Sequence, residues 1–363
     1  MKVTVAQKNL RRALAFCERI AARNTSLPIL ANTLLKTENG RLRISATNLE
    51  VGIHAVIGAR VEGVGEVAVP ARILSDVVNA IGDDALSLLV SKNSLIIHTP
   101  SLKTTILCQE AKEYPIIPKI TTEPCAKVES ADLASLLGSV IDSVALSESR
   151  PELAGMYLRL APKEIIAAAT DSFRLVERRL ANKTDTQHAV IVPRATVAEL
   201  LRLVSNTAGE VAIRIGDNQI AFTHDEFELI SRLVDGRYPD YTKVIPEKTT
   251  TKVIVGKEEF EKAIRTAALF SSSIADIKLA CHGGMLTVTA RNSAKGEAEA
   301  TVPVTTTGEE FELSLNHAYF LDGLKIIPTE NVVLEYTGKG TALILRPEDG
   351  PSGIVYLIMP LRA

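Results

Sequence analysis

The spacing of hydrophobic positions changes along the chain. Near the N-terminus it has the period of a helix, and then it alternates as in β-strands. An apolar stripe with steps of three and four residues predicts an amphipathic helix near the N-terminus: Leu10, Leu14, Cys17 and Ala21. Pro28 is expected to stop this helix. Residues 29–37 and 41–46 then alternate like strands on either side of the turn Glu38-Asn39-Gly40.

A second helix and a hairpin follow. Residues 71–81 after Pro70 have the pattern of a short helix, and alternating apolar residues flank a turn at residues 91–94, which predicts a β-hairpin. The same hairpin pattern returns around residues 216–218 and again around residues 338–340.

The whole pattern is written three times. Val3, Val128 and Val253 begin the repeats at intervals of 125 residues, and a second marker before each later helix returns at intervals of 123: Val69-Pro70, Val192-Pro193 and Leu315-Asn316. A period this long predicts whole domains rather than a solenoid. We therefore expect three domains, at residues 1–120, 126–245 and 246–363, joined by threonine-rich linkers.

Each repeat predicts two short helices and about eight strands, an α+β domain with the helices on one side of antiparallel sheets. Such domains leave strand edges unpaired, and an unpaired edge invites another chain. Two copies closing head to tail would form a ring of six domains.

Composition excludes several classes of protein. The chain is 46% hydrophobic and 23% charged with a net charge of −2, so charge alone gives no sign of nucleic acid. We expect a soluble, cytoplasmic protein, since no apolar run approaches the ~18 residues of a membrane span and no signal peptide is evident. The four cysteines and six histidines are dispersed, which predicts reduced thiols, no metal site and no disulfide framework.

Four segments together resemble the bacterial DNA polymerase III β subunits, the family of β sliding clamps: Leu27-Pro28-Ile29-Leu30, Ala169-Thr170-Asp171-Ser172-Phe173-Arg174-Leu175, Asp235-Gly236-Arg237-Tyr238-Pro239-Asp240-Tyr241 and Met359-Pro360-Leu361-Arg362. The resemblance spans the full chain. It implies a non-catalytic homodimeric ring, with helices inside and sheets outside, that encircles duplex DNA without reading its sequence. Such a ring is a processivity factor in DNA replication: it tethers the DNA polymerase III α subunit, the clamp loader and other polymerases and repair proteins, with no cofactor, metal or membrane.

The resemblance also implies a pocket for partner peptides that carry a glutamine and terminal hydrophobic residues. Its expected residues are Leu153, Thr170, Ser172, Phe173, Arg174, Leu175, Pro239, Lys243, Val244, Asn316, Tyr319, Leu357, Ile358, Met359, Pro360, Leu361 and Arg362. Aliphatic and methionine side chains suit an adaptable apolar cleft, in which Arg174 and Asn316 could fix peptide backbone or glutamine groups. Ser172 and Phe173 depart from the small residue and histidine common in the family, and Phe173 is expected to narrow the cleft.

Two further surfaces follow from the resemblance. The residues expected to face DNA are Arg11, Arg12, Arg19, Arg23, Arg72, Arg150, Arg194, Arg202, Lys262 and Arg265, and the six presumed inner helices carry a net charge of only +3. The residues expected at the dimer interface are Lys103, Thr105, Leu107, Leu269, Phe270, Glu297 and Glu299. Lys103 could pair with Glu297 or Glu299, although exposed pairs contribute only ~0 to 1 kcal/mol each.

Two alternatives remain open from the sequence. A metal-dependent nuclease would need carboxylates such as Asp171, but no catalytic motif accompanies them. A specialised or drug-resistant clamp copy would keep the fold and change the pocket, and the Ser172-Phe173 departure motivates this second alternative.

Overall fold

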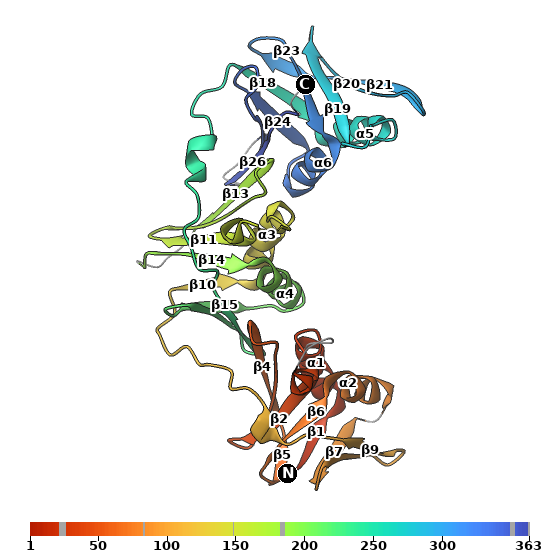
Figure 1. Ribbon diagram of the computed structural model, residues 1–363, viewed down its shortest axis with the longest axis vertical. Helices are drawn as coiled ribbons and strands as arrows, with labels where there is room; N and C mark the ends of the chain where they lie inside the picture. The colour runs from red at the N-terminus through yellow and green to blue at the C-terminus, as the bar shows by residue number, and fades with distance from the viewer. Residues whose placement is uncertain (22–26, 83, 148, 182–185, 349–352, 362–363) are drawn as a thin grey trace. The chain divides into compact units, whose positions relative to one another are not determined.

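The structure is a computed structural model that describes residues 1–21, 27–82, 84–147, 149–181, 186–348 and 353–361. It contains two compact units, which are described separately (Figure 1). Unit 1 comprises Met1–Ala131 and Arg202–Leu233, and unit 2 comprises Asp132–Leu201 and Val234–Ala363. Residues of the second sequence repeat therefore belong to both units.

Unit 1 packs two helices against two antiparallel sheets. The helices are α1 (Gln7–Cys17) and α2 (Ala71–Ala80), which lie against each other and against the strands (Figure 1). The strands of the first repeat are β1 (Lys2–Ala6), β2 (Asn32–Glu38), β3 (Arg41–Thr47), β4 (Val51–Gly58), β5 (Arg60–Gly63), β6 (Glu66–Pro70), β7 (Ala85–Ser91), β8 (Ser94–His98) and β9 (Lys103–Leu107). The second repeat adds β10 (Ala126–Glu129), β15 (Glu210–Ile215), β16 (Gln219–Thr223) and β17 (Phe227–Arg232). The sheet orders are β5-β1-β7-β8-β9 and β10-β15-β16-β17-β4-β3-β2-β6.

Unit 2 holds the rest of the second repeat and all of the third. Its helices are α3 (Ser130–Val140), whose first two residues fall in unit 1, α4 (Arg194–Val204), whose last turn does so, α5 (Lys257–Ala268) and α6 (His317–Ile326). Its strands are β11 (Gly155–Ala161), β12 (Glu164–Thr170), β13 (Arg174–Ala181), β14 (His188–Pro193), β18 (Thr251–Gly256), β19 (Asp276–His282), β20 (Met285–Asn292), β21 (Gly296–Pro303), β22 (Thr305–Thr307), β23 (Phe311–Asn316), β24 (Asn331–Tyr336), β25 (Leu343–Pro347) and β26 (Ile354–Ile358). The sheet orders are β14-β11-β12-β13-β26-β25-β24-β18-β22 and β21-β20-β19-β23, again antiparallel.

The helices bury the apolar faces that their sequences predict. Leu10, Leu14 and Cys17 of α1 are at most 1% exposed. In unit 2, Phe260 of α5 meets Phe320 of α6 edge to face, with ring centroids 5.1 Å apart. The three predicted hairpins are confirmed as β7–β8, β15–β16 and β24–β25.

Two predicted elements end or begin elsewhere. The first helix ends at Cys17 rather than continuing to Ala21, and the Arg202 guanidinium donates to the last-turn carbonyls of Ala15 and Phe16 at 3.2 Å each, which satisfies two carbonyls that lack a partner within the helix. The first strand begins at Asn32 rather than at residue 29. Pro28–Ala31 instead forms a 3-10 turn, and the Asn32 side chain holds that turn by donating to the carbonyl of Ile29 at 3.1 Å.

Strand pairing between repeats creates two seams with one register. In the first seam, within unit 1, β17 pairs with β4 and Glu228 faces His54. In the second seam, within unit 2, β26 pairs with β13 and Val355 faces Glu177. His54 and Glu177 occupy equivalent positions, since each lies opposite the third residue from the C-terminal end of the preceding strand. In both seams, therefore, the last strand of one repeat pairs with the fourth strand of the preceding repeat, in the same register.

Candidate peptide-binding pocket

A tight turn between β12 and β13 forms one wall of the pocket. Asp171 Oδ1 accepts the backbone N–H groups of Phe173 and Arg174, each at 3.0 Å, and Thr170 Oγ1 donates to the Arg174 carbonyl at 2.6 Å. These bonds hold Ser172 at φ 78°, in the left-handed region. Phe173 is consequently pushed outward, and its side chain is 59% exposed.

Arg174 connects this turn to its surroundings. Its Nε donates to Asp171 Oδ2 at 3.0 Å, and its two terminal nitrogens donate to the Asp322 carboxylate and to the Asp142 carbonyl. The guanidinium carbon also lies 4.5 Å from the centre of the Tyr319 ring. These bonds use three of the five guanidinium N–H groups, so Arg174 supports the turn and also lines the cavity.

An interdomain strap, defined as residues 238–244, forms the opposite wall. Tyr238 stacks on Tyr157 with centroids 5.1 Å apart, and Tyr241 meets Tyr157 edge to face. The Tyr241 hydroxyl donates to the buried Glu177 carboxylate at 2.7 Å, and Arg179 donates to the other Glu177 oxygen at 2.8 Å. Burial, together with this bond, raises the pKa of Tyr241.

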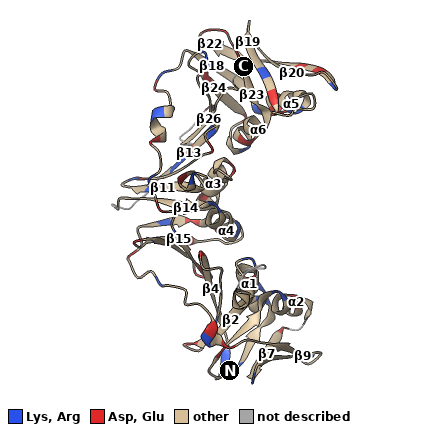
Figure 2. Ribbon diagram, in the orientation of Figure 1, with Lys and Arg blue, Asp and Glu red and all other residues tan. Residues whose placement is uncertain are grey.

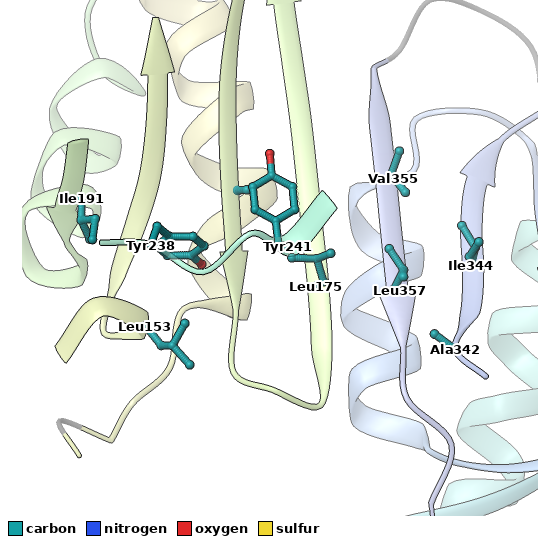
Figure 3. Packing of buried hydrophobic residues seen from close by; sticks show 10 residues of the cluster. Leu153, Leu175, Ile191, Tyr238, Tyr241, Ala342, Ile344, Val355 and Leu357 are labelled. Atoms are coloured by element: carbon teal, nitrogen blue, oxygen red, sulfur yellow. The ribbon is translucent and has the colours of Figure 1, made fainter. Parts of the chain in front are cut away.

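Figure 3 shows Tyr238 and Tyr241 lying over the second-repeat strands, with Leu357 and Val355 presented by β26 on the other side. The cavity that remains has a volume of about 180 Å³. It is lined by Arg150, Leu153, Thr170, Ser172, Arg174, Leu175, Pro239, Asp240, Tyr241, Val244, Leu357 and Met359. An open apolar floor with a few polar groups at the rim suits a short peptide with hydrophobic side chains.

Comparison with known proteins decides the family. Three family models match, one for each repeat: the N-terminal domain of the DNA polymerase III β subunit at residues 1–118, the central domain at 127–240 and the C-terminal domain at 242–362. The chain belongs to the DNA polymerase III β subunit family, the β sliding clamps. The predicted family and the predicted fold of three clamp domains are therefore confirmed. The predicted function, a DNA sliding clamp without catalytic activity, is confirmed as well.

Relatives match from end to end. A β sliding clamp of Pseudomonas putida is 30% identical over 368 residues, with all of both chains covered. The crystal structure of the DNA polymerase III subunit β from Pseudomonas aeruginosa superposes with a TM-score of 0.96 at 29% identity over all of both chains. A sliding clamp from the same organism was solved bound to griselimycin, with a TM-score of 0.94 at 28% identity over all of both chains.

The structure brings nine of the predicted pocket residues together around the cavity and gives the others different places. Phe173 stacks near Tyr319 beside the pocket, with ring centroids 6.5 Å apart. Asn316 caps helix α6, because its side-chain oxygen accepts the N–H groups of Ala318 and Tyr319. Four further predicted residues do not line the cavity: Lys243, Ile358, Pro360 and Leu361. Arg362 lies outside the described residues.

Three lining residues were absent from the predicted set. Asp240 and Tyr241 belong to the quoted strap motif, so the sequence did carry a signal for them. Hydrogen bonds from Thr242 and Lys243 lower the pKa of the Asp240 carboxyl, which keeps an anion at the rim. Arg150 was predicted to face DNA, yet it lines the pocket, and only long-range folding could reveal that placement.

The nuclease alternative depended on Asp171, but both carboxylate oxygens of Asp171 accept hydrogen bonds within the β12–β13 turn. Its carboxylate accepts bonds from Phe173 and Arg174. Within the residues that the structure describes, no group of three or more His, Cys, Asp or Glu side chains could hold a metal ion. In the same part of the chain no helix is long and apolar enough to cross a membrane.

The arginines and lysines predicted to face DNA differ in their freedom. Arg11, Arg19 and Arg72 are exposed, whereas Arg194 is half-buried. Ion pairs or carbonyl contacts within the same unit engage Arg72 and four others: Arg72 with Asp76, Arg12 with Glu226, Arg202 with the end of α1, Lys262 with Glu258 and Arg265 with Glu261. Arg23 lies outside the described residues. Charged residues are spread over helices, strands and loops alike (Figure 2).

The predicted interface residues lie on or beside two sheet edges. β9, which carries Lys103, Thr105 and Leu107, is the outer strand of the five-stranded sheet, and β21, which carries Glu297 and Glu299, is the outer strand of the four-stranded sheet. Leu107 is 77% exposed and Leu269, just after α5, is 67% exposed. Phe270 lies against the start of β21 at Gly296.

Proposed function

We propose that two copies of this chain close head to tail into a ring around duplex DNA, and that the ring tethers replication and repair proteins through the pocket in the cytoplasm. The observation that carries the proposal is the repeated seam. In both seams within the chain, the last strand of one repeat pairs with the fourth strand of the preceding repeat. These pairs are β17 with β4 and β26 with β13. The equivalent strands left over are β9 and β21, and both are sheet edges.

The register of the missing seam follows from the other two. On the last strand of each repeat, Lys103 corresponds to Glu228 and Val355. Each of them comes one residue before the residue that pairs with an inner residue of the neighbouring hairpin strand; these pairs are Thr104 with Ile97, Leu229 with Phe222 and Tyr356 with Leu345. Glu299 corresponds to His54 and Glu177 when the three turns are aligned on Asn48, Asp171 and Asn292, whose side chains each accept the backbone N–H two residues on. The strand residue three positions before each of these is Ser45, Ala168 and Thr289, and these pair with His54, Glu177 and Glu299. The proposed seam therefore sets Lys103 opposite Glu299 and Thr105 opposite Glu297.

The pleat of the two edges supports this register. Lys103 and Thr105 are exposed on β9 while Ile106 is buried, and on β21 Glu297 and Glu299 are exposed while Ala298 is half-buried. Exposed residues thus meet exposed residues, whereas a slip by one residue would set exposed side chains against buried ones. The exposed Leu107 and Leu269 supply apolar surface beside the strand pairing.

Weak binding to DNA is compatible with this function. Among the described residues, five of the predicted DNA-facing cations are engaged in ion pairs or carbonyl contacts: Arg12, Arg72, Arg202, Lys262 and Arg265. A closed ring needs no base contact and few phosphate contacts to stay on duplex DNA, and many such contacts would slow its sliding.

The pocket supports the tethering part of the proposal. A hydrophobic peptide side chain can enter between Leu175, Leu357 and Val244, and the charged Arg150 and Asp240, which also line the cavity, can bind polar groups of the peptide. The proposed ligands are segments of the DNA polymerase III α subunit, the clamp loader and repair proteins. Phe173 projects outward beside the pocket instead of lining it. Affinity for a generic clamp-binding peptide separates a housekeeping clamp from a specialised copy.

Retention on DNA tests the ring. The protein is loaded on nicked circular DNA by its clamp loader and ATP, washed at salt that screens phosphate contacts, and measured before and after the circle is cut. We expect retention on the circle and loss on linearisation. Equal loss from both forms would indicate electrostatic binding, and equal retention would indicate a specific DNA contact; either result contradicts the proposal.

A further inference from the structure

The first seam carries a cleft assembled from the same parts as the pocket at the second seam. Its lining includes Thr47, Leu49 and Gly52 from the β3–β4 turn, Pro115–Pro118 from the first interdomain segment, and Ile230 and Arg232 from β17. We call it the first-seam cleft; its volume is about 250 Å³. All of these residues belong to unit 1.

The turn that forms one wall repeats the turn of the pocket bond for bond. Asn48 Oδ1 accepts the N–H groups of Glu50 and Val51, as Asp171 does for Phe173 and Arg174. Thr47 Oγ1 donates to the Val51 carbonyl at 2.9 Å, and the third turn residue, Leu49, has φ 78°, the value found at Ser172 in the pocket. Leu49 therefore projects from the turn, lines the cleft and is 48% exposed.

The strap of the first-seam cleft differs in a way that favours an extended ligand. In the pocket, the strap forms a 3-10 turn and the Tyr241 hydroxyl bonds to Glu177. In the first-seam cleft, residues 115–120 run without helix or strand, and within the described residues no hydrogen bond from the backbone N–H groups of Ile116, Ile117 or Ile120 is found. Free backbone groups along an exposed, extended segment can pair with an added strand.

The apolar and polar groups define what such a strand would carry. Ile116 is 92% exposed, and Ile117 packs so closely over Gly52 that a Cβ there would lie 2.6 Å from its methyl group. Around this apolar centre lie Asn218, Gln219 and a loose pair, Arg232 with Glu50 at 3.6 Å, so the rim is polar with no net charge. The geometry suits one large hydrophobic side chain flanked by uncharged polar residues.

We propose that the first-seam cleft is a second peptide-binding site, which takes an extended segment of a partner protein with one large hydrophobic side chain next to an amide or hydroxyl side chain. The inference rests on the proposed peptide pocket, because the first-seam cleft is the repeat-related counterpart of that pocket. A partner with two such segments could then engage both seams of one chain.

Methyl NMR of the full-length protein tests the site. The probe is a short peptide with a glutamine and two C-terminal hydrophobic residues, titrated into protein labelled at isoleucine and methionine methyl groups. Ile116, Ile117 and Ile230 report on the first-seam cleft, and Met359 reports on the pocket. We expect saturable shifts at both sets, and in Val244→Asp, which blocks the pocket, the isoleucine shifts should persist.

Substitutions at the most exposed cleft residue complete the test. Ile116→Asp should weaken binding at the cleft by about tenfold or more, while Ile116→Val should leave it nearly unchanged, and neither should alter the Met359 titration. If only Met359 shifts, the second site is refuted and the pocket stands. If neither set shifts, both proposals fail. Isoleucine shifts that depend on protein concentration without peptide would identify a self-contact and overturn the inference.

Discussion

Reversing one charge at the proposed intermolecular seam tests both its location and its register. Lys103→Glu would set two carboxylates opposite each other at Glu299. An opposite-charge pair across strands contributes ~0.2–1 kcal/mol, and like charges cost a similar amount, so the reversal costs ~0.4–2 kcal/mol per seam. A dimeric ring contains this seam twice, which gives ~1–4 kcal/mol and a rise in the dimer Kd of roughly 5-fold to 700-fold.

Apolar burial decides whether the ring survives this change. Leu107 and Leu269 are mostly exposed in the single chain, and covering each would contribute ~1–2 kcal/mol, or ~4–8 kcal/mol over two seams. This exceeds the charge effect. We therefore expect Lys103→Glu to weaken the dimer without abolishing it, in sedimentation or mass photometry, with a smaller effect at 0.5 M than at about 0.05 M salt.

A second substitution in the same chain reads the register. The swap Lys103→Glu with Glu299→Lys restores the opposite-charge pair in both seams and should restore the dimer Kd to within a few-fold of the original. Lys103→Glu with Glu297→Lys is the matched control, because Glu297 already pairs with Arg291 at 2.8 Å within its own sheet. Better rescue by Glu297→Lys would shift the register by two residues. No effect of Lys103→Glu alone would refute the seam.

Three further predictions concern the pocket and the core. Tyr241→Phe removes the hydroxyl that bonds to the buried Glu177 carboxylate, and should lower the free energy of unfolding in urea by ~1–3 kcal/mol and weaken peptide binding; unchanged values for both would contradict the support role. Burial, with Arg43 and Lys119, lowers the pKa of His54 from 6.5 to about 4, so the unfolded chain binds this proton more readily and stability should fall as pH drops from 6.5 to about 4, by ~3 kcal/mol at most. His54→Gln should remove this part of the pH dependence, whereas the exposed His98→Gln should keep it, and equal slopes in both variants would contradict the assignment. Deletion of residues 359–363 removes Met359 from the pocket and should leave a dimer that no longer binds the peptide; retained affinity in a fluorescence titration would contradict the pocket.

Local pattern predicted most of the fold, because helix and strand periods are written into neighbouring residues. The stripe at Leu10 and Leu14, and the turn at Asn39-Gly40 with its two positive φ angles, are properties of a few consecutive residues. The end of α1 was not predictable in this way. The carbonyls that it leaves without a helical partner include those of Ala15 and Phe16, which bond to Arg202, a residue far along the chain that reaches them only after folding.

The pocket residues show the same contrast between what a local motif predicts and what only the folded chain determines. Thr170, Leu175 and Met359 lie in recognisable motifs, and the structure brings them to one cavity. Roles were harder to predict than positions. Arg174 and Asn316 were expected to contact a ligand, but their polar atoms bond to Asp171, Asp322 and the first turn of α6, contacts that no spacing in the sequence reveals.

The two seams within the chain and the proposed intermolecular seam would share one register but differ in chemistry, and the difference follows from what each must do. Where Val355 meets Glu177, the carboxylate is buried and bonded to Tyr241, so opening that seam would expose an apolar cluster and break a buried hydrogen bond. That seam is permanent because it lies within one chain. At the proposed intermolecular seam the same position holds the exposed Lys103 and Glu299, whose separation returns both charges to water at little cost. A ring must open to admit DNA, and the intermolecular seam, whose paired charges are exposed in the single chain, is the one we expect to open.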